Sequence, residues 1–414
     1  MRRYDNLEYP DGLIKQEVNK NLQLVVVIPA YNEKDLLQTI ESLYKNTFEN
    51  AIVEIIVLIN QSETASGELT AFHQKQHMQL QRLSNNSSDN NIRLYPLFIK
   101  DIPDKIAGVG LARKIGMDEA YRRLELAGNE KGIIACLDGD TRVQTNYLQT
   151  LLSEAVTSNK IKAYSIYFEH DLQSAAQDER YAIIQYELHL RYYINMQRLL
   201  GLPFAYYTIG SAMAVRSYAY AEAFGMNKRQ AGEDFYFLHK YIKTGYFREI
   251  NETTVMPAAR ISDRVPFGTG KALAKIIESR SILRTYNYRS FIILEDLLSN
   301  LQLLYEDYDK AEAMLKKPLQ EFLSIQNFDL RYQEIKRHTK DFIGFRKRFF
   351  RWFDAFMLMK YLHYARDKYY ANIAITDAVD FLFDKMSLSC PATLEEKLHV
   401  LRERDKAIFP WNKP

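Results

Sequence analysis

The sequence LQLVVVIPAYNE, residues 22–33, sets the fold class. Residues 22–29 are apolar and largely β-branched, without a helical period, which predicts a buried strand. Pro29 favours an end to the strand, and Asn32 is a suitable first residue for a helix. The apolar side chains at 36, 37, 40, 43 and 44 would then lie on one helix face. We therefore expect a buried strand followed by a helix that covers it.

The alternation of apolar strand and helix continues to about residue 270. Further strands are predicted at residues 52–59, 92–99, 133–137, 161–168 and 208–215. Helices are predicted at residues 69–81, 111–126, 146–156 and 175–200, and from residue 232 onward. This order indicates an α/β fold with a mostly parallel sheet covered on both faces, and ligands in such folds bind at the carboxyl ends of the strands.

Helical patterns alone are expected from residue 271 onward. A chain of 414 residues is long for one domain, so two units are expected. We predict an N-terminal arm at 1–21, an α/β domain at 22–274 and an all-helical domain at 275–414.

Composition narrows the classes of partner. There are 55 Lys and Arg against 52 Asp and Glu, so the net charge of +3 gives no field that would favour nucleic acid. The apolar runs are far shorter than the roughly 20 residues that a membrane helix needs, and the N-terminus has no apolar signal core. Two cysteines cannot build a disulfide framework or a thiolate zinc site. We expect a cytoplasmic protein that does not bind nucleic acid.

Acidic side chains follow the strand at 133–137, in the order Asp138-Gly139-Asp140. Carboxylate oxygens suit Mg²⁺ or Mn²⁺, which can in turn bridge the phosphates of a nucleotide. A surface Asp-Gly turn is the alternative for this motif. Pro29 to Glu33 can likewise be read as a strand end and a helix cap alone.

Three segments together resemble the family 2 glycosyltransferases. They are VVVIPAYNE at 25–33, GVGLARKIGMDEA at 108–120 and IIACLDGDT at 133–141, and their order and spacing match over roughly residues 22–270. The resemblance implies a GT-A fold and a DxD motif that binds a metal ion and the nucleotide-sugar donor.

The same resemblance assigns residues to the donor site. Pro29, Ala30, Tyr31 and Glu33 would line the nucleoside pocket, Asp138 would contact ribose or metal beside Gly139, and Asp140 would be the main ligand of Mn²⁺ or Mg²⁺. At the end of the second strand the family usually has an Asp that reads the base, and here Asn60 stands in its place. An amide both donates and accepts hydrogen bonds, whereas a carboxylate only accepts them, so the identity of the nucleotide base is left open.

Arg113 and two further arginines are candidates for the diphosphate. Arg113 follows Gly108-Val109-Gly110 at a helix start, where free N–H groups and a guanidinium suit an anion. Arg260 and Arg264 flank a Gly- and Pro-containing loop that could close over the donor. For Arg113 the alternative is a Gly-rich helix entry, and for Arg260 and Arg264 it is an interdomain linker. In both alternatives the charges would be solvated.

Glu233 and Asp234 resemble the family's ED motif. By that resemblance Asp234 is the general base of an inverting displacement, with Glu233 as second candidate. The alternative is that the helix dipole simply favours acidic residues in a first helical turn. His239 is expected to be a packing or surface histidine.

Aromatic residues suggest where an acceptor would bind. Those at 186–193 and 204–207 could be platforms for a sugar, although most of the 29 Tyr and 22 Phe are expected in the core. Residues 346–364 carry an apolar helical stripe with cations, for which packing within its own domain is preferred over covering the site or lying on a membrane.

The resulting expectation is metal-dependent transfer of a sugar, such as a hexosyl group, from a nucleotide-diphosphate sugar. The acceptor would be a sugar, lipid or small molecule, with possible peripheral contact at the inner face of the membrane. A sugar-phosphate nucleotidyltransferase is one alternative, but it would carry a Gly-rich loop directly after the first strand. A catalytically silent nucleotide-sugar-binding or scaffold protein is the other.

Overall fold

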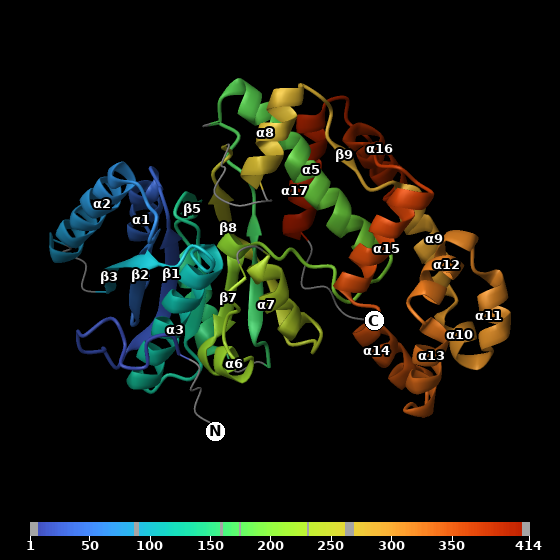
Figure 1. Ribbon diagram of the computed structural model, residues 1–414, viewed down its shortest axis with the longest axis horizontal. Coiled ribbons are helices and arrows are strands. Elements are labelled where there is room, and N and C mark those ends of the chain that lie inside the picture. The colour runs from blue at the N-terminus through green and yellow to red at the C-terminus, as the bar shows by residue number, and fades with distance from the viewer. Residues whose placement is uncertain are drawn as a thin grey trace.

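The computed structural model describes residues 7–86, 91–157, 160–173, 175–229, 232–260 and 269–407 (Figure 1). Its centre is a sheet in the order β3-β2-β1-β4-β7-β6-β8-β5. The strands are β1 (Leu22–Ala30), β2 (Ile52–Ser62), β3 (Ile92–Ile102), β4 (Ile133–Cys136), β5 (Thr141–Val143), β6 (Ala163–Phe168), β7 (Met213–Arg216) and β8 (Phe247–Pro257). The sheet is parallel from β3 to β4 and between β6 and β8, and antiparallel at β7 and β5. The predicted α/β class is confirmed.

Both faces of β1 are buried, which is why its sequence is apolar without alternation. Val25 and Val27 face a core shared with α3 (Val109–Ala127), whereas Val26 and Ile28 face a second core. The second core includes side chains from α1 (Leu36–Tyr44) and α4 (Tyr147–Val156), and α2 (Gly67–Asn86) contacts β3. The period of two along a strand thus distributes one apolar run between two helix layers.

Three details of the predicted elements are corrected. The first helix begins at Leu36 rather than at Asn32, because Asn32 has a left-handed φ of 49° and its N–H donates to Nε2 of His73 (3.0 Å). The strand expected at 208–215 is only β7, preceded by the 3-10 turn η1 (Gly210–Ala212). Strands β5 and β8 were not predicted, since FREINETTVMP in β8 has neither an apolar run nor a clean alternation.

Helices dominate the rest of the chain. Those attached to the sheet domain are α5 (Gln177–Leu199), α6 (Ser217–Glu222), α7 (Glu233–Ile242) and α8 (Thr269–Ser279). Those that follow are α9 (Tyr288–Ser299), α10 (Leu301–Glu306), α11 (Tyr308–Met314), α12 (Lys317–Ile325), α13 (Phe328–Arg337), α14 (Phe342–Trp352), α15 (Ala355–Lys368), α16 (Ile375–Lys385) and α17 (Leu394–Ala407). This region is not purely helical, because β9 (Arg284–Thr285) and β10 (Ile373–Ala374) form an antiparallel pair.

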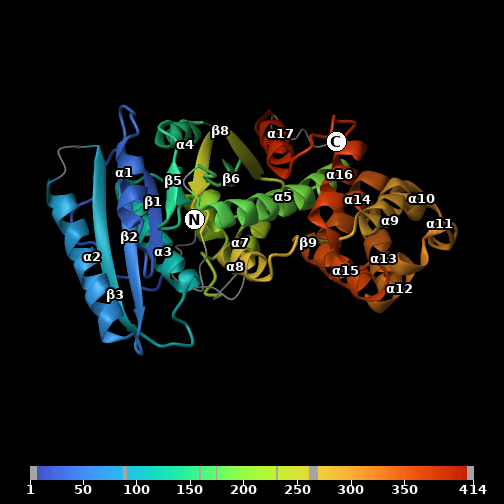
Figure 2. The same ribbon diagram turned by 90° about the horizontal axis from the view of Figure 1, so that it is seen from above.

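The long helix α5 joins the sheet to the C-terminal helices (Figure 2). Helix α8 packs on α5, and the last described helix, α17, returns to pack on α5 and β8. The boundary that we propose near residue 275 therefore lies within α8. No membrane-spanning helix is found in the described ranges.

Candidate active site

A cleft of about 840 Å³ lies at the carboxyl ends of the central strands. All but one of the site residues expected from the sequence line it, and they are Pro29, Ala30, Tyr31, Glu33, Asn60, Arg113, Asp138, Gly139, Asp140, Glu233, Asp234 and Arg260. Arg264 lies outside the described residues. Parallel neighbours end at one edge of a sheet, and this edge brings together residues more than 200 positions apart.

Pairing of β1 with β4 aligns the two turns that hold most of these residues. Leu137 N donates to the carbonyl of Val27 (3.1 Å), so the strands end side by side. A Cβ on Gly139 would lie 2.8 Å from Cγ of Glu33, so glycine permits the close approach of the two turns. Thr39 Oγ1 donates to the carbonyl of Gly139 (2.9 Å) and ties α1 to the same edge.

The turn after β1 is supported by His73, which sequence reasoning missed. Because the N–H of Asn32 donates to Nε2, Nδ1 carries the proton and donates to Oε1 of Gln61 (3.1 Å). The ring of Tyr31 meets the His73 ring edge-on at 5.6 Å. Asn60 is buried beside this turn and faces the cleft.

Arg113 is buried between two carboxylates rather than exposed at a helix start. Its guanidinium donates to Oδ1 of Asp138 (2.6 Å) and to Oε1 of Glu233. Burial opposes its charge, but Glu233 and Asp138 outweigh that and raise its pKa above the ordinary range. The alternative of a solvated cation at a helix entry is therefore wrong for Arg113, which links the DGD turn to α7.

Arg260 stands at the second carboxylate of the DGD motif. Its Nη2 and Nε donate to Oδ2 of Asp140 at 2.8 and 3.0 Å, and Nη2 also donates to Glu33. Arg260 is thus a cleft residue rather than part of a solvated linker. Asp138 and Asp140 offer the oxygen ligands that Mg²⁺ and Mn²⁺ prefer. Within the described ranges, no group of three or more His, Cys, Asp or Glu side chains that could hold a metal ion is found.

Glu233 and Asp234 begin α7 and differ in their surroundings. Glu233 is 3% exposed and paired with Arg113, whereas Asp234 is half-buried at the cleft and accepts from its neighbour Phe235 N (2.7 Å). Burial first, and then the charge of Glu233, raises the pKa of Asp234 to about 6. That value suits a group that accepts a proton near neutral pH.

The opposite wall of the cleft is aromatic. It includes Phe168, Tyr186, Tyr193, Phe204, Tyr206 and Tyr207 from β6, α5 and the segment after it. His170 and Tyr286, to which the sequence did not point, also line it, together with His189 from the segment at 186–193 and Ala355 and Met359 from the segment at 346–364. His170 and Tyr286 lie in short loops after β6 and β9, where no periodicity marks them.

Helix α15 closes one side of the cleft. Phe356 packs against the rings of Phe235 (4.7 Å) and His239 (5.9 Å) of α7. Phe349 and Phe353 in the preceding segment are fully buried, and Phe349 packs against Phe328 of α13 (6.2 Å), as expected for packing within the helical domain. Phe356 and Ala355 instead cover the cleft, so the stripe combines the preferred reading with the alternative of covering the site. His239 is a packing histidine, as expected, and burial lowers its pKa to about 4.

Comparison with known proteins identifies the domain that holds this cleft. Residues 25–221 match the model of Glycosyl transferase family 2. Residues 25–221 of this chain are a family 2 glycosyltransferase domain. The matched region contains β1, the DGD turn and α5, while Asp234 and Arg260 lie beyond it. No curated protein sequence matches the chain.

Solved structures with a similar arrangement include other glycosyltransferases. S. aureus TarS 1-349 in complex with UDP-GlcNAc is 13% identical, with a TM-score of 0.40 over 89% of this chain and 93% of that chain. The mannosyltransferase PcManGT from Pyrobaculum calidifontis, in complex with GDP-Man and Mn²⁺, is 12% identical, with a TM-score of 0.35 over 79% and 91%. These ligands are those of the two solved proteins.

Proposed function

We propose that this glycosyltransferase moves a sugar from a nucleotide-diphosphate donor to a hydroxyl acceptor, with a divalent cation and with inversion at the anomeric carbon. The proposal is carried by one observation: a single cleft holds the turn after β1, the carboxylates of the DGD motif and a carboxylate of raised pKa. Each of the three has a separate part in such a reaction.

Donor binding would use the sheet edge. Tyr31 and Asn60 flank the space next to the turns, where a nucleoside would lie. Asp140 and Asp138 would hold Mn²⁺ or Mg²⁺, which supplies positive charge to the diphosphate. Because Arg260 now binds Asp140, cation binding competes with that guanidinium, and a released Arg260 would be available to the leaving group.

Asp234 would act on the acceptor. Its carboxylate accepts the proton of the attacking hydroxyl, the new glycosidic bond forms, and the bond between the anomeric carbon and the diphosphate breaks. One displacement from the face opposite the leaving group inverts the configuration. Glu233 is engaged by Arg113, which favours Asp234 for this role.

Thermal shift with a panel of UDP-, GDP- and dTDP-sugars, each with and without Mn²⁺, tests the proposal. A donor should raise the melting temperature more with Mn²⁺, by mass action, and Asp140→Asn should remove that increment. Product analysis by NMR should then show an inverted anomeric centre. Binding without turnover would indicate a silent binding protein, and release of pyrophosphate from a nucleoside triphosphate would indicate a nucleotidyltransferase.

Peripheral membrane contact is a separate part of the proposal. Lys347, Arg348 and Arg351 are exposed on α14, next to Ile343, which is 79% exposed. Cations beside an exposed apolar side chain suit an anionic bilayer surface. The protein should sediment together with vesicles of anionic phospholipid at low salt, and it should stay in the supernatant with vesicles of zwitterionic lipid.

A further inference from the structure

His170, directly beyond the end of β6, is a cleft residue held on almost every side. Its backbone N–H donates to Oε2 of Glu187 (3.0 Å), and its ring Nδ1 lies 2.9 Å from the same oxygen. Its carbonyl accepts from Nη2 of Arg402 (2.9 Å), which lies on α17. The ring is therefore fixed in place while the residue lines the cleft.

The partner of Nδ1 determines which ring nitrogen carries the proton. Glu187 is completely buried, and burial alone would raise its pKa, but Arg191, His170 and Arg402 together hold that pKa well below its ordinary value. An ionised carboxylate only accepts, so Nδ1 donates to Glu187 and Nε2 is the ring nitrogen left for a ligand in the cleft. Among the described residues, none donates a hydrogen bond to Nε2.

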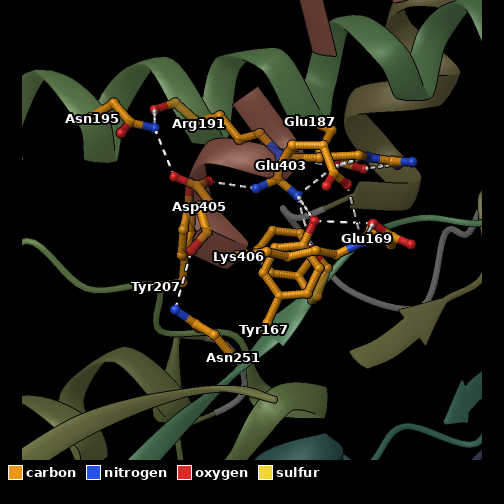
Figure 3. Close-up of polar contacts among 12 residues, drawn as sticks. Tyr167, Glu169, Glu187, Arg191, Asn195, Tyr207, Asn251, Glu403, Asp405 and Lys406 are labelled. Atoms are coloured by element: carbon orange, nitrogen blue, oxygen red, sulfur yellow. Dashed lines mark hydrogen bonds and ion pairs between the residues drawn. The ribbon is translucent and has the colours of Figure 1, made fainter. Parts of the chain in front are cut away.

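The surrounding wall supplies ring faces. Phe168 meets His170 edge-on at 5.8 Å and Tyr207 at 5.2 Å. The hydroxyl of Tyr207 donates to Oδ2 of Asp405 on α17 (2.7 Å). Asp405 also accepts a hydrogen bond from Nη1 of Arg191 (Figure 3). Packed aromatic rings beside one ring nitrogen that can form a hydrogen bond suit a ligand with apolar C–H faces and hydroxyl groups.

We propose that the acceptor is a carbohydrate and that Nε2 of His170 forms a hydrogen bond with one of its hydroxyl groups, with Glu187 as the positioning residue of the ring. The proposal rests on the proposed function and deepens it, since it names the substrate class of the acceptor side of the same cleft. Asp234 remains the group that removes the reacting proton, and His170 binds a different hydroxyl or orients the same one.

Two substitutions separate binding from scaffolding. In H170N the side-chain amide lies near the position of Nδ1, so a donor to Glu187 is kept. In H170Q the longer side chain places its amide near the position of Nε2. With the best nucleotide-sugar donor and a panel of methyl hexopyranosides and methyl pentopyranosides, H170N should raise the acceptor KM about tenfold, the equivalent of one lost hydrogen bond. H170Q should keep an acceptor KM near that of the wild type. The exposed His399 on α17 provides the control, H399Q.

A purely structural role predicts the reverse, with H170Q damaged and H170N intact, and that result overturns the assignment of His170. Hydrolysis of the donor without transfer to any of the glycosides overturns the carbohydrate acceptor. If a variant fails to fold, ¹⁵N-histidine NMR of the wild type decides, because the Nε2 signal of His170 should shift when the methyl glycoside is added, and an unchanged signal refutes the contact. The titration needs no donor, so its result is independent of the proposed donor chemistry.

Discussion

Asp234→Asn should increase stability while it abolishes transfer. The amide keeps an oxygen that can accept from Phe235 N but removes a charge that is unfavourable in this position. Burial, followed by the charge of Glu233, raises the pKa of Asp234 from 3.8 to about 6. A carboxyl group with a raised pKa binds protons more tightly in the folded state, so wild-type stability falls as pH rises from about 4 to about 6 and the loss is constant above that.

The size of the effect follows from the shift. The rise of about two units in the pKa of Asp234 lowers the free energy of unfolding by about 3 kcal/mol at pH 7.5. At pH 4.5 the same linkage lowers it by about 1 kcal/mol. We therefore expect Asp234→Asn to raise the free energy of unfolding by up to about 3 kcal/mol at pH 7.5 and by much less at pH 4.5. Transfer should fall by roughly 10²–10⁴-fold, the usual contribution of a general base.

Urea unfolding at the two pH values and initial rates of transfer measure the two effects. The exposed Asp384, replaced by Asn, is the matched control and should change neither. Wild-type kcat/KM should rise with pH through about 6 as Asp234 ionises. Equal stability changes at both pH values would contradict the argument from burial and charge, and a variant within tenfold of wild-type rate would remove Asp234 as the base.

Three further substitutions test other contacts. Arg260→Gln should bind Mn²⁺ roughly tenfold more tightly in the absence of donor, measured by EPR of free Mn²⁺, because a cation that competes for Asp140 is gone; unchanged affinity would show that the ion binds elsewhere. Asp405→Asn should lower the free energy of unfolding by about 3 kcal/mol in urea, because two buried arginines lose a shared anion, whereas the exposed Glu403→Gln should have little effect. Gly139→Ala should weaken binding of the donor's nucleoside diphosphate by roughly tenfold in calorimetry, because its Cβ would lie 2.8 Å from the neighbouring turn; wild-type affinity would show that the turns can separate without cost.

Local patterns were sufficient for most strands of the sheet and for the residues at its carboxyl edge, whereas β5 and β8 were missed. The apolar run before Pro29 and the run before Asp138 each predicted a buried strand, and parallel strands necessarily bring their ends to one edge. The residues at those ends were therefore predictable as neighbours, although their roles in donor and metal binding remain proposals.

The pairing of charges required the folded chain. The sequence made Arg113 and Arg260 candidates for binding a diphosphate and gave no signal at Asp405, yet the structure pairs each of them with a residue more than 100 positions away. Sequence periodicity records which face of an element is apolar, but it carries no record of which distant charge neutralises a buried one.

The acceptor wall shows the same division. Aromatic residues at 186–193 and 204–207 were visible as candidate platforms, whereas His170, its partner Glu187 and the returning helix α17 were not. A hydrogen bond between a strand end and two helices depends on how those elements cross, and the crossing is set by the packing of side chains from the whole core. The sequence by itself thus determined most of the sheet and the edge at which its strands end, and only the tertiary structure decided which polar groups are paired there.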